Sequence, residues 1–189
     1  MRLRVTHYGE SILRQPGERV TVFDDALRQL AADMVDTMYE EEGVGLAAQQ
    51  VDRALMLCVL DVSGLPDEEL DYQLDGLKPP IDLIMPMALV NPVIQPLPGK
   101  VLVGEEGCLS FPGIRGDVPR ADLIEVKYQD LNGNAHVLVC RDWFARVVQH
   151  EVDHLNGRLF IDQMDKRQLR LLDRQIKKLQ RETRAALSE

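Results

Sequence analysis

The chain has few cysteines, no long apolar run and an excess of negative charge, and each of these features excludes a class of protein. Three cysteines at irregular spacing argue against a disulfide framework and for a reducing compartment. No apolar run is long enough to span a membrane, and no apolar stretch follows the basic start as in a signal peptide. The net charge of −9 argues against a surface built to bind nucleic acid. We therefore expect a cytoplasmic protein without membrane or DNA partners.

The length and composition of the chain fit one globular domain over residues 1–189. Helical periodicity predicts helices at 24–42, 143–156 and 165–189, with Gly43 ending the first, and 45–51 reads as a turn. Short strands are predicted between them, and Asn132-Gly133 indicates a hairpin. Strands bracketed by helices give the class α+β. The acidic, proline-containing stretch 63–86 is predicted to be an inserted surface loop. The predicted strands are 55–62, 89–94, 101–103, 122–128 and 135–140.

The segment His150-Glu151-Val152-Asp153-His154 is the most informative part of the chain. On a helix, residues four apart share a face, so both imidazoles can reach one divalent metal with Glu151 beside it. A metal-assisted hydrolase needs this combination of two neutral nitrogen ligands and a carboxylate that moves protons. The same pattern also occurs by chance on ordinary charged helices.

A metal site of this type needs a third ligand from elsewhere in the chain. Cys108 is the favoured candidate because it follows a predicted strand and Gly107, which lets the backbone come close to a ligand. The alternatives for Cys108 are a buried thiol or a lone nucleophile. The remaining histidines are expected at or near the surface and the remaining cysteines in the apolar core. These residues are His7, His136, Cys58 and Cys140.

Residues 43–51 form a third segment of interest, Gly-Val-Gly-Leu-Ala-Ala-Gln-Gln-Val. Its small side chains would let a substrate or another chain segment approach the backbone. It has neither the Lys-Ser/Thr ending of a phosphate loop nor a GxGxxG pattern. A tight connection between a helix and a strand explains the segment equally well on its own.

Taken together, the three segments resemble the signature motifs of the peptide deformylase family: GVGLAAQQ at 43–50, EGCLS at 106–110 and HEVDHLNG at 150–157. The resemblance runs from about His7 to Phe160, and the leucine after the motif cysteine points to the bacterial-type branch. It implies antiparallel sheets packed around a central helix that carries the HExxH motif, with N- and C-terminal helices. It also implies an enzyme that removes the N-formyl group from the formyl-methionine of nascent polypeptides and releases formate.

The resemblance assigns the metal ligands to Cys108, His150 and His154. Hydroxide generated at the metal would attack the formyl carbon, with Glu151 as general base and then general acid. It implies Fe(II) as the physiological metal, with Zn(II), Ni(II) or Co(II) able to occupy the site. A thiolate ligand suits Fe(II) and makes the centre sensitive to oxidation.

Further roles follow from the same resemblance. The side-chain amide of Gln50 and the backbone N–H of Leu109 would stabilise the oxyanion, while Glu106 and Gly107 would support the geometry of the metal loop. The resemblance also assigns contacts with the substrate chain to Gly45 and Arg115. Apart from the resemblance, the methionine side chain would need an apolar pocket beside the central helix. The candidates for this pocket, which could equally be plain core, are Val44, Trp143 and Val147.

Three other readings remain open at this stage. A zinc endopeptidase would need a downstream third ligand, and no histidine follows His154. A nucleophilic Cys108 with a histidine base would leave the HExxH pairing unexplained. A non-catalytic metal-binding module would have no need of Glu151 or Gln50.

The sequence departs from the family pattern in two places and carries a basic tail. Asp142 stands where glycine is common, and we expect it to cap the central helix without harm. The 63–86 stretch is longer than in the smallest members and could change the rim of the site or an interface. Residues 165–189 hold eight Lys/Arg against four Asp/Glu. This predicts either a solvated helix face or a contact with ribosomal RNA.

Overall fold

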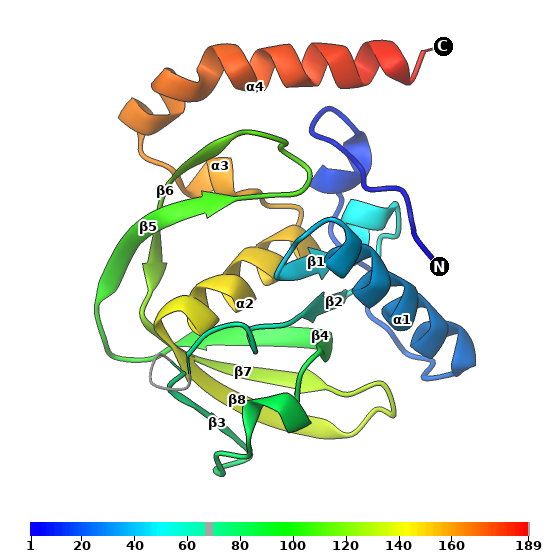
Figure 1. The fold of residues 1–189 in the computed structure, drawn as a ribbon, viewed down its shortest axis with the longest axis vertical. Coiled ribbons are helices and arrows are strands. Elements are labelled where there is room, and N and C mark those ends of the chain that lie inside the picture. The colour runs from blue at the N-terminus through cyan, green and yellow to red at the C-terminus, as the bar shows by residue number, and fades with distance from the viewer. Residues whose placement is uncertain (67–69, 189) are drawn as a thin grey trace.

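The computed structural model of the protein describes residues 1–66 and 70–188. It confirms the predicted α+β class and places helix α2 between a six-stranded sheet and a separate two-stranded hairpin, β5–β6 (Figure 1). All pairings between the named strands are antiparallel, and the large sheet has the order β1-β2-β4-β7-β8-β3. The strands are β1 (Gly45–Ala47), β2 (Leu57–Leu60), β3 (Tyr72–Leu74), β4 (Met87–Pro96), β5 (Val101–Gly107), β6 (Arg115–Ala121), β7 (Leu123–Gln129) and β8 (Ala135–Arg141). The helices are α1 (Asp25–Glu40), α2 (Asp142–Leu155), α3 (Phe160–Gln163) and α4 (Lys166–Ala186), with short 3-10 helices η1 (Ser11–Arg14), η2 (Ala48–Val51) and η4 (Ile81–Leu83).

Helix α1 forms where the sequence predicts it, but its last turn closes differently. Asp24 caps the N-terminus by accepting a hydrogen bond from the backbone N–H of Leu27 at 3.0 Å. At the other end Glu42, not Gly43, takes the left-handed conformation, with φ of 56°. The Gly43 N–H then donates to the carbonyl of Met38 at 2.8 Å, which satisfies one of the free carbonyls of the last turn.

The other sequence predictions for the sheets are confirmed in part. The β7–β8 hairpin forms as predicted, and Gly133 in its turn has φ of 85°. Strand β6 was not predicted. The predicted turn at 45–51 is wrong, because this segment forms strand β1 and the 3-10 helix η2.

The stretch 63–86 is more ordered than the predicted surface loop. Residues 67–69 lie outside the described residues. Beyond them, β3 pairs with β8 and forms one edge of the large sheet, and η4 follows. Strand β3 therefore extends the large sheet at the edge formed by β8 (Figure 1).

Helix α2 enters from β8 through a strained residue. Asp142 is the first residue of the helix and has φ of 54°, a left-handed conformation that favours glycine. Its N–H donates to the carbonyl of Asp122 at 2.8 Å, and this bond accompanies the sharp turn from strand to helix. The N-cap is Arg141, and no side chain caps the helix, so the predicted capping role of Asp142 is wrong.

One face of α2 is buried in the main core as predicted, through Phe144, Val147, Val148 and Leu155. The opposite side faces the β5–β6 hairpin (Figure 1). This position between the two sheets places the HExxH motif at the centre of the molecule.

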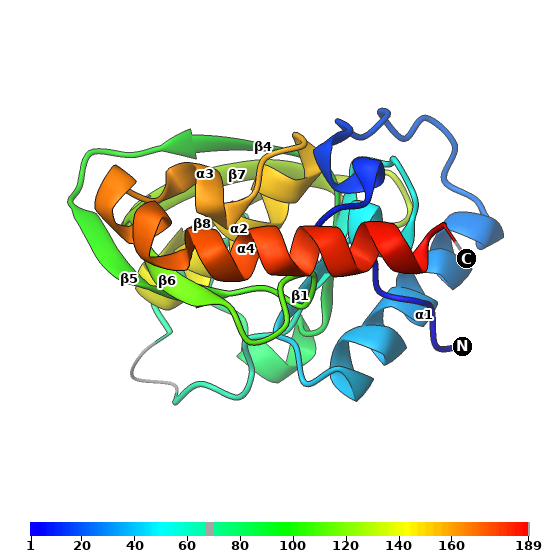
Figure 2. The ribbon, with the colours of Figure 1, turned by 90° about the horizontal axis from the view of Figure 1, so that it is seen from above.

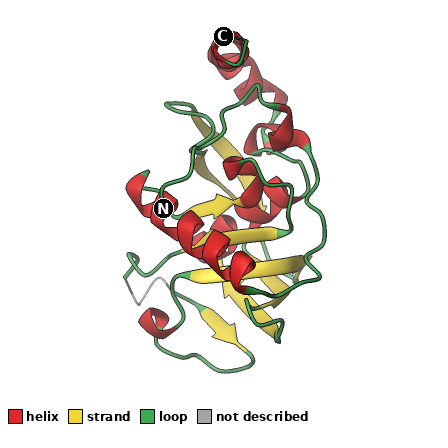
Figure 3. Ribbon diagram, turned by 90° about the vertical axis from the view of Figure 1, so that its right-hand side faces the viewer, coloured by secondary structure: helices red, strands yellow, loops and turns green. Residues whose placement is uncertain are grey.

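Helix α4 lies at one end of the molecule, over the β5–β6 hairpin and the N-terminal segment (Figures 2 and 3). Asp165 caps it by accepting hydrogen bonds from the N–H groups of Arg167 and Gln168, both at 2.8 Å. Of its residues only Ile176 is buried. The predicted tail ends with Glu189, which lies outside the described residues. Within the described residues, no helix combines the length and apolarity needed to cross a membrane.

Candidate active site

Helix α2 carries the three residues of the HExxH motif into the interior. His150, Glu151 and His154 are 9%, 4% and 1% exposed. Helix α2 ends at Leu155, and Gly157, the predicted C′ residue, has φ of 69°. A Cβ at Gly157 would lie 2.6 Å from the carbonyl oxygen of Arg14, so glycine is required there for two reasons.

Cys108 follows β5 and meets the two histidines. The ligand atoms of Cys108, His150 and His154 all lie within 4.8 Å of one another, and Cys108 Sγ lies 3.3 Å from His154 Nε2. One thiol sulfur and two imidazole nitrogens on three sides of a small space match the donor set of a tetrahedral zinc- or iron-type site with one open position. The residues therefore fit a divalent metal.

Glu106 orients the first histidine. Its Oε2 lies 2.9 Å from His150 Nδ1, which leaves the Nε2 atom of His150 for the metal position. Arg120 approaches the same carboxylate through two nitrogens at 2.9 and 3.0 Å. Burial alone would raise the pKa of Glu106, but the hydrogen bonds from Arg120 and His150 outweigh it and lower the pKa to about 2. Glu106 is thus an anion beside His150 at neutral pH.

Arg146 is a second buried cation at this carboxylate, 6% exposed. Its Nη1 donates to Glu106 at 2.8 Å and to the Val118 carbonyl at 2.8 Å, and its Nη2 donates to the Leu102 carbonyl at 2.7 Å. A Cβ at Gly104 would come within 3.0 Å of the same guanidinium. Arg146 therefore joins both strands of the β5–β6 hairpin to α2, one helical turn before His150.

Sequence reasoning missed both arginines. Arg146 lies four residues before His150, so the helical periodicity places it on the metal side, and this signal could have identified it. Arg120 lies on β6, a strand that was not predicted, and no local pattern connects it to Glu106.

Glu151 has the surroundings of a group that exchanges protons near neutral pH. Burial is the main cause that raises its pKa to about 7, while the nearby imidazole of His150 opposes the rise. Its Oε2 is buried and has no hydrogen-bond partner among the described residues. A Cβ at Gly45 would lie 2.3 Å from Glu151 Oε1, so the β1 backbone passes directly over the carboxylate. The small-residue segment thus allows a close approach.

Gln50 is held with its amide nitrogen toward the thiol. Its Oε1 accepts a hydrogen bond from the Ala47 N–H at 2.8 Å, which fixes the side-chain orientation. Its Nε2 then lies 3.4 Å from Cys108 Sγ and 3.3 Å from Ser110 Oγ. An N–H donor of Gln50 therefore points toward the thiol of the candidate metal cluster.

A cleft of about 520 Å³ opens onto these groups. It also contains residues that the sequence did not assign to the site, among them His7, which is exposed as expected, and Ile114. Val147 belongs at once to the cleft wall and to the core, whereas Trp143 is 38% exposed at the rim. All the predicted substrate-contact and oxyanion residues lie along the cleft, as does Gly107 of the metal loop: Val44, Gly45, Gln50, Leu109, Arg115, Trp143 and Val147.

Apart from His7, the histidines and cysteines set aside by the sequence analysis lie outside the cleft. Cys58 and Cys140 are fully buried in the core, and burial raises the pKa of both thiols. His136 is half-buried, with its Nδ1 atom 2.7 Å from Asp75.

Comparison with known proteins gives matches along nearly the whole chain. The family model described as polypeptide deformylase matches residues 2–170. The peptide deformylase of Opitutus terrae is 54% identical over 189 residues, which cover 98% of this chain and 97% of the relative. The peptide deformylase of Microchaete diplosiphon is 40% identical over 163 residues, covering 86% and 79% of the two chains.

Solved structures show the same fold. An inhibitor complex of a peptide deformylase from Arabidopsis thaliana superposes with a TM-score of 0.84 at 32% identity, covering 100% of this chain and 95% of the other. A Synechococcus elongatus peptide deformylase in complex with actinonin superposes with a TM-score of 0.77 at 38% identity, covering 92% and 85%. Sequence and fold agree over nearly the full length, and the chain belongs to the polypeptide deformylase family.

Proposed function

We propose that this protein removes the formyl group from the N-terminal formyl-methionine of nascent polypeptides, releasing formate. The observation that carries the proposal is the buried Cys108–His150–His154 cluster with the unpartnered Glu151 oxygen beside it. When bound there, a divalent metal would lower the pKa of a water molecule and polarise the formyl oxygen.

Glu151 is the proposed proton carrier. With a pKa of about 7, its carboxylate takes a proton from the attacking water and returns it to the amine that leaves. Its free Oε2 faces no competing protein donor within the described residues. The Gly45 backbone covers the carboxylate and restricts its movement toward β1.

Gln50 and Leu109 are the proposed oxyanion donors. The Gln50 amide is already oriented by its bond to the Ala47 N–H, so no reorganisation is needed when negative charge develops on the formyl oxygen. Removing one such donor typically lowers the rate about 100- to 1,000-fold. Val44, Trp143 and Val147 are the proposed contacts of the methionine side chain, and Arg115 of the following residues.

Formate release from formyl-Met-Ala-Ser under anaerobic conditions tests the proposal. We expect turnover by the metal-loaded protein, loss of turnover in Cys108→Ala and in metal-free protein, and a rate about 100- to 10,000-fold lower in Glu151→Gln with its metal retained. Hydrolysis at full rate by Glu151→Gln would refute the proton-carrier role while leaving the metal site in place.

We also propose Fe(II) as the physiological metal, with Zn(II), Ni(II) or Co(II) as possible substitutes. The mixed thiolate and imidazole donor set supports this choice because it suits iron and tolerates the other ions. Metal analysis of protein purified without oxygen tests it. Zinc at full occupancy and no iron, under conditions that keep iron reduced, would refute it.

A ribosome contact through α4 is a further proposal, consistent with a cytoplasmic location. All eight basic side chains of α4 are exposed, and Ile176 is its only buried residue. Co-sedimentation with ribosomes in low salt should weaken when four of these charges, at Arg170, Arg174, Lys177 and Arg181, are replaced by glutamine. Unchanged co-sedimentation would refute the contact.

A further inference from the structure

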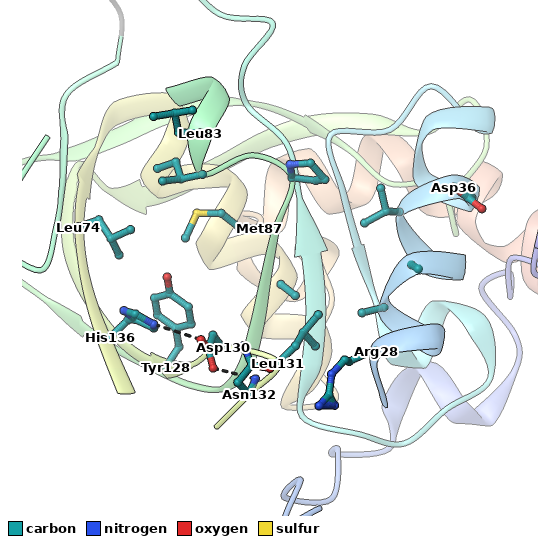
Figure 4. A pocket seen from close by; sticks show the side chains of 16 residues that line it. Arg28, Asp36, Leu74, Leu83, Met87, Tyr128, Asp130, Leu131, Asn132 and His136 are labelled. Carbon is teal, nitrogen blue, oxygen red and sulfur yellow. Dashed lines mark hydrogen bonds and ion pairs between the residues drawn. The ribbon is translucent and has the colours of Figure 1, made fainter. Parts of the chain in front are cut away.

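A second pocket, of about 670 Å³, lies between α1 and the end of the large sheet, outside the HExxH cleft (Figure 4). Its walls combine the outer face of α1, the start of β4, the β7–β8 hairpin and parts of the segment 74–86. The ionisable side chains around the pocket are those of Arg28, Asp36, Asp130 and His136 (Figure 4). The floor is apolar and includes Ala31, Val35, Leu74, Ile84, Met87 and Leu131.

One polar group inside this pocket has no partner. Tyr128 is 7% exposed, its hydroxyl points into the pocket in Figure 4, and it makes no hydrogen bond to any described residue. The hydroxyl is open to the pocket and can donate to an acceptor that enters from outside the chain.

The surroundings of Tyr128 indicate which acceptor fits. Burial raises the pKa of this phenol, and the carboxylates of Asp75 and Asp130 raise it further, so the hydroxyl keeps its proton and is available as a donor. The same carboxylates disfavour an anionic acceptor. A neutral carbonyl oxygen with an apolar group beside it satisfies both the hydroxyl and the floor, and a peptide unit with an apolar side chain has this chemistry.

Helix α1 connects this pocket to the cleft. Asp36 lines the pocket, and Glu42, just past the end of the helix, lines the cleft. The last helical residue, Glu40, lies four residues after Asp36, a rise of about 6 Å, which is the length of about two extended peptide residues. Tyr39 lies between them, is 48% exposed and is fixed by a hydrogen bond to Asp61.

We propose that the pocket is an exosite for the polypeptide substrate. It receives an apolar side chain about six to eight residues after the formyl-methionine, while a backbone carbonyl of that stretch accepts the hydrogen bond of Tyr128. The proposal rests on the proposed function, because only a polypeptide substrate extends far enough from the metal to reach α1.

Substrate length and composition test the exosite. We compare formyl-Met-Ala-Ser with formylated decapeptides that are polar throughout, or that carry one leucine at each position from five to nine. Leucine at one or two adjacent positions should lower KM about tenfold relative to the polar decapeptide, with kcat unchanged. A KM that is the same for every decapeptide would overturn the proposal.

Variants on α1 and at Tyr128 test whether the leucine advantage in KM arises in this pocket. Ala32 is exposed and lines the pocket, so Ala32→Phe fills it, whereas Ala26→Phe adds the same ring to an exposed α1 position outside it. Ala32→Phe should abolish the leucine advantage and Tyr128→Phe should reduce it several-fold. Ala26→Phe should keep it, and all three should process formyl-Met-Ala-Ser normally.

The outcomes also separate the two proposals. A leucine advantage that survives in Ala32→Phe would place the contact elsewhere and overturn the exosite. Absence of formate release even from formyl-Met-Ala-Ser would count against the proposed function instead.

Discussion

Arg146→Met is the sharpest test of how the metal centre is supported. Methionine keeps most of the side-chain volume but removes the cation that joins Glu106 to the carbonyls of Leu102 and Val118. Removing one partner of a buried ion pair costs about 3–5 kcal/mol. Arg120 still pairs with Glu106, so we place the expected loss of unfolding free energy at the lower end, about 3 kcal/mol.

The assay is urea-induced unfolding of the metal-loaded protein, followed by circular dichroism. Competition with a chelator adds a second readout, and metal affinity should fall about 10- to 100-fold because Glu106 orients His150 less firmly. Arg158→Met is the matched control. Arg158 is exposed, has no ion pair within the described residues, and should cost less than about 0.5 kcal/mol. A loss below about 1 kcal/mol with unchanged metal affinity would refute the reasoning.

Three further predictions concern single residues. Asp142→Gly should raise the unfolding free energy by up to about 1 kcal/mol because φ of 54° no longer opposes a side chain; a lower melting temperature would contradict this. Gly45→Ala should lower kcat/KM at least about 100-fold in a folded protein, because the Cβ displaces the Glu151 carboxylate, and normal kcat/KM would show that the carboxylate can move. Glu106 has a folded pKa of about 2 against an ordinary 4.5, so it contributes about 3 kcal/mol that is complete above pH 4.5 and lost as the pH falls toward 2. In Glu106→Gln this acid-dependent loss should flatten in urea titrations between these pH values, and an unchanged slope would contradict it.

The helix with the HExxH motif could be predicted because every local signal agreed. Its apolar stripe has helical period, and Gly157 ends it through a conformation that only glycine adopts easily. The hairpin turn at Gly133 was predictable for the same reason. In each case the chemistry of a few adjacent residues determines the backbone.

Strand β6 could not be predicted because its sequence is poor in strand formers. Gly116 and Pro119 both weaken a strand, and Val118 is its only aliphatic β-branched residue. The strand forms because it pairs with β5 along its length, and that pairing brings Arg120 opposite Leu102. A contact of this kind depends on register between distant segments, which no local pattern contains.

Asp142 shows a second reason why prediction from sequence fails. Aspartate before an apolar helical stripe is a good capping signal, yet here the residue enters the helix with a left-handed backbone. The turn from β8 into α2 imposes this conformation through the bond to the Asp122 carbonyl. Tertiary geometry overrode a local preference.

The close approach of Gly45 to Glu151 also bears on how inhibitors of this cleft could fail. Any side chain at position 45 would collide with the carboxylate that the proposed chemistry requires. A substitution of Gly45 is therefore expected to cost activity. A compound that hydrogen-bonds to the Gly45 peptide group would touch a part of the cleft that has almost no escape mutations. Trp143 and Val44 are both more than one-third exposed at the rim, so a compound anchored on either residue would face many escape mutations. Resistance should therefore appear first at the rim.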